Sequence, residues 1–309
     1  MDTRLHTLAR HAALSTIFLS AGYVSAAYAE EYSKAYSLTG PAEVRVHADS
    51  GSVRVTTSET SQVEFHVSYD KSDWESSAAP QIDSRQSGKV VELTALTPGP
   101  GRRWFGFGKR RLSIEVRMPA KGDLSIDTSN GAIDVSNLSG NIVLRSSNGA
   151  IRAAQLAGTA DIGSTNGRVE LNAVKGTLKA VTSNGAITAT GLDGKCDVET
   201  QNGGVDVAGR FDSLAIHTQN GAVTARAESG SRVSSVWDIS TTNNSVNLSV
   251  PRDLKANLDA GATNGHIELD LPVTVQGYQS GTQIRGALNG GGPEMSVHTT
   301  NGGIHLSGA

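Results

Sequence analysis

The chain has 309 residues with 27 Lys and Arg against 30 Asp and Glu, and its net charge of −3 argues against general binding to nucleic acids. Its single cysteine, Cys196, excludes an internal disulfide, so the fold must depend on packing and backbone hydrogen bonds. The 35 glycines follow no collagen period and accompany few aromatic residues, which is typical of many short strands separated by tight turns.

The first 29 residues have the features of a signal peptide. Arg4 and Arg10 make a positively charged start, residues 12–21 are apolar, and Ala-Tyr-Ala at 27–29 is a cleavage motif. The apolar run is shorter than the roughly 20 residues that a membrane anchor needs. We therefore expect residues 1–29 to direct export, and the mature protein to lie in the periplasm or on the cell surface.

An 18-residue repeat dominates the middle of the chain. The dipeptide Asn-Gly recurs at this interval, with asparagines at Asn130, Asn148, Asn166, Asn184, Asn202 and Asn220. A second glycine follows ten residues after most of them, for example Gly158 and Gly176. A fixed period near 20 residues indicates a solenoid in which each repeat is one coil. We expect the asparagines to stack as a structural ladder, and Asn-Gly to supply the positive φ angles of a tight turn.

Apolar and polar residues alternate within each coil. Counted from the asparagine as position 0, positions +3, +5, +8, +12 and +14 are apolar in most coils, and Phe211 should substitute for Arg210 at a +8 position. Alternation with period two predicts strands with one buried face, so each coil should contain two short strands and two turns. By the same parity, Cys196 is a small core residue. A buried hydroxyl row is predicted two positions before the asparagines, at Thr128, Ser146, Ser164, Thr182, Thr200 and Thr218.

The pattern continues less regularly toward both ends of the chain. Asn243, Asn264 and Asn301 each precede two alternating apolar residues, and Ser50-Gly51 does so near the start. A left-handed hexapeptide helix does not fit, because the column that it would bury contains Arg145. We predict one all-β domain at 30–309, a parallel β-helix or β-solenoid of about ten coils, right-handed by general chain chirality. Its parts are irregular N-terminal coils with a capping loop at 30–126, regular coils at 127–230, and irregular coils at 231–309.

The two ends raise separate questions. The last apolar pair, Ile304 and Leu306, predicts a terminal coil with an exposed strand edge. Near the other end, a Gly- and Pro-rich segment contains cations and aromatics together: Arg102, Arg103, Trp104, Phe105, Phe107, Lys109, Arg110 and Arg111. Such residues are typical of a contact with an anionic surface or partner. A flap that covers the end of the solenoid is the competing interpretation, and it is favoured because an open solenoid end needs covering.

Catalytic and metal-binding motifs are absent from the sequence. It contains no His-x-x-x-His, Cys-x-x-Cys, Gly-x-Ser-x-Gly or P-loop spacing. The outward +4 column alternates in sign, as on a solvated face: Asp134, Arg152, Glu170, Thr188, Asp206 and Thr224. We therefore expect no cofactor, no metal and no enzymatic activity. A glycan-cleaving β-helix would require acidic residues that converge in one groove.

The order of these motifs resembles the DUF4097 family of β-strand-repeat proteins, which are described as candidate adhesins. The resemblance rests on residues 50–55 (SGSVRV), 117–121 (RMPAK), 127–133 (DTSNGAI), 263–267 (TNGHI), 290–293 (GGGP) and 300–304 (TNGGI). It implies a β-helix exported to the bacterial cell envelope, with no catalytic motif. We thus expect a non-enzymatic scaffold that binds an unknown envelope or surface macromolecule, a protein, glycan or lipid surface. The alternative is a structural protein that self-associates end to end through its terminal coils.

Overall fold

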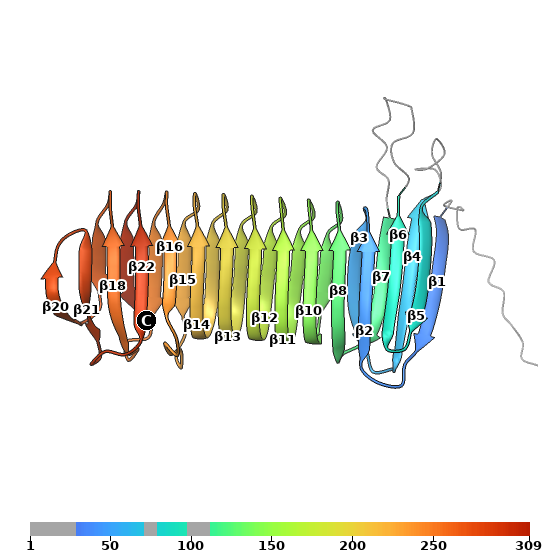
Figure 1. Ribbon diagram of the computed structural model, residues 1–309, viewed down its shortest axis with the longest axis horizontal. Coiled ribbons are helices and arrows are strands. Elements are labelled where there is room, and N and C mark those ends of the chain that lie inside the picture. Colours follow the sequence, from blue (N-terminus) through green and yellow to red (C-terminus); the bar gives the residue numbers. More distant parts are fainter. Residues whose placement is uncertain (1–28, 71–78, 98–111) are drawn as a thin grey trace, which may run out of the picture.

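The computed structural model describes residues 29–70, 79–97 and 112–309. The predicted signal peptide and the basic aromatic segment at 102–111 lie outside these ranges. Every regular element in them is a β-strand, and Figure 1 shows the strands side by side along one long axis. The predicted all-β fold is therefore confirmed. None of the described residues belongs to a helix that is long and apolar enough to cross a membrane.

The strands form two rows, and in four of the coils a single long strand runs through both. The first row contains, in spatial order, β1 (Ala29–Ser37), β4 (Gln62–Asp70), β7 (Leu112–Pro119), β3 (Ser52–Ser58), β9 (Ile133–Ser136), the first halves of β11 (Ile151–Ser164), β12 (Val169–Thr182), β13 (Ile187–Thr200) and β14 (Val205–Thr218), then β15 (Val223–Ala227), β17 (Val246–Val250), β23 (Ile304–Gly308) and β19 (Ile267–Asp270).

The second row contains β5 (Gln81–Ser87), β6 (Val90–Leu96), β2 (Ala42–Ala48), β8 (Gly122–Thr128), β10 (Ser139–Ser146), the second halves of β11 to β14, then β16 (Trp237–Thr241), β22 (Glu294–Thr299), β18 (Ala256–Ala262), β21 (Gln283–Leu288) and β20 (Val273–Gln279). Together the two rows make one continuous 23-stranded sheet. They share a single hydrophobic core.

The central coils stack in parallel with an offset of 18 residues, as the period predicts. Ile151 pairs with Val169, and Val169 pairs with Ile187. The two predicted strands of a coil are joined, because β11 to β14 are each 14 residues long and continue through the second turn. In β11 this turn uses positive φ at Gln155 and Gly158, and its residues stay in register with the next coil. The hand of the coil remains a prediction.

The predicted inward columns are buried. Phe211 is completely buried in place of Arg210, and its ring meets that of Trp237 edge to face with the centroids 6.2 Å apart. Cys196 is also buried, and this burial raises the pKa of its thiol to about 12, so at neutral pH it behaves as a small apolar core residue. The interior is a filled core along the described part of the chain.

Five of the six buried hydroxyls close the Asn-Gly turn and join it to the preceding coil, whereas the hydroxyl of Thr128 has no hydrogen-bond partner among the described residues. Ser164 accepts a hydrogen bond from the Gly167 N–H at 2.9 Å and donates one to the Gly149 carbonyl at 3.2 Å. The prediction of positive φ for the glycine after each asparagine is wrong, since none of these glycines has one. Glycine is required there because a Cβ on Gly167 would overlap the carbonyl oxygen of Gly149 in the neighbouring coil.

The predicted exposed C-terminal strand is also wrong. Strand β23 pairs in parallel with β17 on one side and β19 on the other, and β22 is likewise enclosed by β16 and β18. Figure 1 accordingly places the C-terminus inside the row. At the other end, β2 lies between β6 and β8. Both segments therefore insert between strands that neither precede nor follow them directly in sequence.

Antiparallel pairs lie at both ends of the stack, although the last strand of the first row, β19, is parallel to β23. The pairs are β1 with β4 and β5 with β6 at one end, and β18 with β21 and β21 with β20 at the other. At the N-terminal end the hydroxyls of Tyr32 and Tyr36 each lie 2.6 Å from Oγ of Ser84, which links β1 to β5. These contacts help to close the N-terminal end of the core.

Candidate functional site

The Asn-Gly turns form one continuous ladder of side-chain hydrogen bonds. Asn148 donates from Nδ2 to Oδ1 of Asn130 at 2.8 Å, and each later asparagine in the stack repeats this bond at 2.7–2.8 Å. In spatial order the ladder is Asn130, Asn148, Asn166, Asn184, Asn202, Asn220, Asn243, Asn301 and Asn264. Because the amides bond mainly to one another, the ladder's first role is to hold the coils in register.

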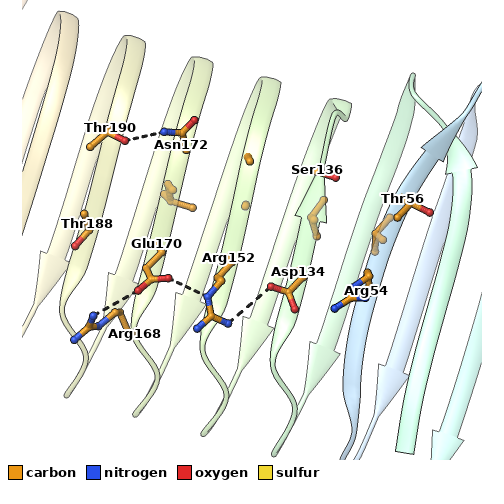
Figure 2. A pocket seen from close by; sticks show the side chains of 15 residues that line it. Arg54, Thr56, Asp134, Ser136, Arg152, Arg168, Glu170, Asn172, Thr188 and Thr190 are labelled. Atoms are coloured by element: carbon orange, nitrogen blue, oxygen red, sulfur yellow. Dashed lines mark hydrogen bonds and ion pairs between the residues drawn. The ribbon is translucent and has the colours of Figure 1, made fainter. Parts of the chain in front are cut away.

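A shallow groove lies on the outer surface of the first row, with a volume of about 620 Å³. It crosses β3, β9, β11, β12 and β13, and Figure 2 shows the side chains from these strands. The lining residues are Arg54, Val55, Thr56, Asp134, Val135, Ser136, Arg152, Ala153, Ala154, Arg168, Glu170, Leu171, Asn172, Thr188 and Thr190. Since stacked strands are about 4.8 Å apart, the groove extends roughly 19 Å along the rod.

A chain of ion pairs runs along one side of the groove. Glu170 contacts Nε of Arg152 at 3.0 Å and Nη1 of Arg168 at 3.5 Å, and Arg152 also reaches Asp134 at 3.9 Å (Figure 2). The guanidinium groups are more than half exposed, so these pairs contribute little to stability. Their arrangement agrees with the alternating +4 column that the sequence suggested.

Arg54 is the exception among these groove cations. It is exposed and stands between Asp134 and Glu115 in the strand register, yet it makes no hydrogen bond or ion pair with the described residues. Figure 2 shows it at the end of the charged row. Its guanidinium donors are therefore available to a ligand.

Small side chains, polar at every position but one, line the other part of the groove, at position +6 of each coil that it crosses. They are Thr56, Ser136, Ala154, Asn172 and Thr190. Asn172 donates to the Thr190 hydroxyl at 3.0 Å. The surface is hollow here because these short side chains alternate with the longer charged ones at +4. The residues that line the groove include no aromatic side chain.

The family assignment agrees with this architecture. A family model described as Toastrack DUF4097 matches residues 42–307, which is most of the chain. The chain belongs to the Toastrack DUF4097 family. The resemblance seen in the sequence is thereby confirmed, and the described Toastrack fold extends over the whole matched range except residues 71–78 and 98–111.

Solved structures similar to this Toastrack chain have low sequence identity. One is a candidate lipid-binding protein from Parabacteroides distasonis (10% identity, TM-score 0.42, 89% of this chain and 96% of that chain covered). Others are a candidate adhesin from Bacteroides fragilis (10%, 0.31, 91% and 97%) and a candidate cell adhesion protein from Clostridium sporogenes (12%, 0.28, 91% and 100%). The functions in these names are those proteins' own. A comparison with curated proteins finds no match.

The Toastrack groove contains no converging acidic pair of the kind that a glycan-cleaving β-helix requires. Its two carboxylates, Asp134 and Glu170, are separated by Arg152, which bridges them. Among the described residues, no three His, Cys, Asp or Glu side chains gather to hold a metal ion. The groove is thus equipped to bind through hydrogen bonds and charge.

Sequence reasoning identified the asparagine ladder of this Toastrack chain and missed the groove. The predicted contact residues at 102–111 lie outside the described ranges, so their role stays a prediction. The groove had a visible signal, the column of small residues at +6 beside the long charged residues at +4. Alternation alone does not show that two such columns leave a hollow between them.

Proposed function

We propose that this chain is a non-enzymatic, adhesin-type binding scaffold of the bacterial cell envelope, exported by residues 1–29. Its groove on β3, β9 and β11 to β13 binds a macromolecular partner. The observation that carries the proposal is the filled interior combined with a groove that is open along the rod and lined by charged, hydroxyl and amide groups beside aliphatic ones. A solid core offers no enclosed site for a small molecule, whereas an extended partner can lie across several coils at once.

The basic aromatic residues at 102–111 form the second part of the proposal, as a further contact with the same envelope partner. The alternative of end-to-end self-assembly was motivated by an exposed edge of the C-terminal strand. Strand β23 has no such exposed edge, because it is enclosed on both sides. Both rows at the N-terminal end, and the second row at the other end, also finish in antiparallel strands, which do not continue the parallel register of the stack.

The groove is tested by filling it. Ala154 is a partly exposed alanine in the groove, and Ala215 is a partly exposed alanine on the second row, outside the groove. Ala154→Trp should reduce sedimentation of the purified protein with washed bacterial envelopes at least about tenfold, because the indole occupies the ligand's space. Ala215→Trp should bind as the wild type does.

Equal binding by the two tryptophan variants, both folded by circular dichroism, would remove the groove from the proposal. The same assay applied to a triple variant, Trp104→Ser, Phe105→Ser and Phe107→Ser, tests the second contact. Unchanged sedimentation of that folded variant would leave 102–111 with the capping role that its composition also fits.

A further inference from the structure

The chemistry of the groove selects among the classes of envelope partner. Its most distinctive group is Arg54, an exposed guanidinium that makes no ion pair with the described residues although Asp134 and Glu115 flank it in the strand register, whereas the other charges that line the groove are paired. A guanidinium presents two parallel N–H donors, the geometry that a carboxylate accepts. Arg168 adds a second accessible cation, since its contact with Glu170 is 3.5 Å long.

Beside this charged row, the groove presents hydroxyl or amide groups on four of the five strands that it crosses. They belong to Thr56, Ser136, Asn172 and Thr190. Neighbouring strands are about 4.8 Å apart, and the spacing is about twice that where Ala154 separates Ser136 from Asn172. A polymer with many hydroxyls can meet several of these groups at once, whereas a single small molecule would use only one or two.

The other macromolecules fit this surface less well. A protein partner is usually anchored by aromatic or large apolar side chains in pockets, whereas the large apolar residues that line this shallow groove, Val55, Val135 and Leu171, are almost completely buried. A lipid surface requires apolar side chains that insert into it. A nucleic acid requires a strong excess of cations, whereas the groove has three guanidinium groups against two carboxylates and the chain has a net charge of −3.

We infer that the partner in the groove is an acidic polysaccharide with carboxylate groups, and this inference rests on the proposed function. Arg54 binds a carboxylate of the polymer in a bidentate manner. The hydroxyl and amide groups at +6 bind the sugar hydroxyls, and the ion-paired row of Asp134, Arg152 and Glu170 forms the wall beside them.

The test measures binding of the full chain to three soluble polymers by isothermal titration calorimetry. The probes are polygalacturonate, which has carboxylates, dextran sulfate, which has sulfates, and uncharged dextran. Wild-type protein should bind polygalacturonate, more weakly as the salt concentration rises. Arg54→Gln should raise the Kd about tenfold, the effect of losing a charge-assisted hydrogen bond. Ala154→Trp should abolish binding.

Arg226→Gln is the matched control for the charge change. Arg226 is an exposed arginine on β15, in the same row of strands as the groove but outside it, and it is paired with Asp206 at 3.4 Å. Its variant should bind polygalacturonate as the wild type does. An equal loss of polygalacturonate affinity in Arg226→Gln and Arg54→Gln would overturn the role of Arg54. Equal binding of dextran sulfate by the wild type and by Ala154→Trp would show that the protein attracts any polyanion.

Failure of this inference is distinguishable from failure of the proposed function. If no polysaccharide binds while envelope sedimentation still depends on Ala154, the groove binds another class of partner and the acidic polysaccharide is excluded. If envelope sedimentation is also insensitive to Ala154→Trp, the groove itself is not the contact.

Discussion

Gly185→Ala is expected to unfold the central coils, although it adds only one methyl group. A Cβ at Gly185 would lie 2.7 Å from the carbonyl carbon of Gly167 and closer still to its oxygen, both backbone atoms of the adjacent coil. The two coils cannot separate locally, because the ladders on either side hold them about 4.8 Å apart. We expect a loss of at least about 4 kcal/mol in the free energy of unfolding, measured by chemical denaturation.

Gly204→Ala is the matched control for this prediction. Gly204 also lies beside an Asn-Gly turn, but its added Cβ would be 3.5 Å from the Ala222 carbonyl oxygen, an ordinary contact, and its φ is not positive. Alanine there should be within about 1 kcal/mol of wild type, in the stabilising direction, because it restricts the unfolded chain. Similar stabilities for the two variants would contradict the close packing of the coils at Gly185.

Deletion of residues 294–309 is expected to destabilise far more than one coil. This segment fills the space between the coil of β16 and β17 and the coil of β18 and β19. It contributes the buried side chains of Met295, Val297, Ile304 and Leu306. Without it, β18 and β19 lose their parallel partners, so residues 256–288 should lose protection in hydrogen exchange measured by mass spectrometry, while β11 to β13 keep theirs.

A shorter deletion provides the control for this experiment. Removing residues 307–309 leaves all four core side chains in place and should preserve protection at 256–288. If the longer deletion also preserved protection there, the C-terminal coil would be a terminal one, as the sequence alone suggested. Loss of a terminal coil from a solenoid affects mainly its nearest neighbour.

The buried positions within one coil were predictable from the sequence, whereas the spatial order of the coils at the two ends was not. Period and parity identified the buried columns, from Ile133 and Val135 to the hydroxyl of Thr218, because these depend on local alternation. The positions of Asn264 and Asn301 indicated that each begins a coil. They did not indicate that the chain folds β20 and β21 outward and then returns to insert β22 and β23.

The role of the turn glycines was missed for a related reason. Asn-Gly is usually a signal for positive φ, and in this chain positive φ occurs at the opposite turn, for example at Gly158 and Gly176. The constraint on Gly167 and Gly185 comes from a backbone atom of the neighbouring coil. Contacts between coils of this kind are not encoded in the residues that flank the turn.

The most direct test of groove binding is arginine labelling with phenylglyoxal, followed by mass spectrometry, with and without solubilised envelope fragments. Arg54, Arg152 and Arg168 line the groove, whereas Arg226 and Arg285 are exposed outside it. We predict that bound fragments slow the labelling of the three groove arginines several-fold and leave the other two unchanged. Unchanged labelling of the groove arginines under conditions where the fragments bind would contradict the account.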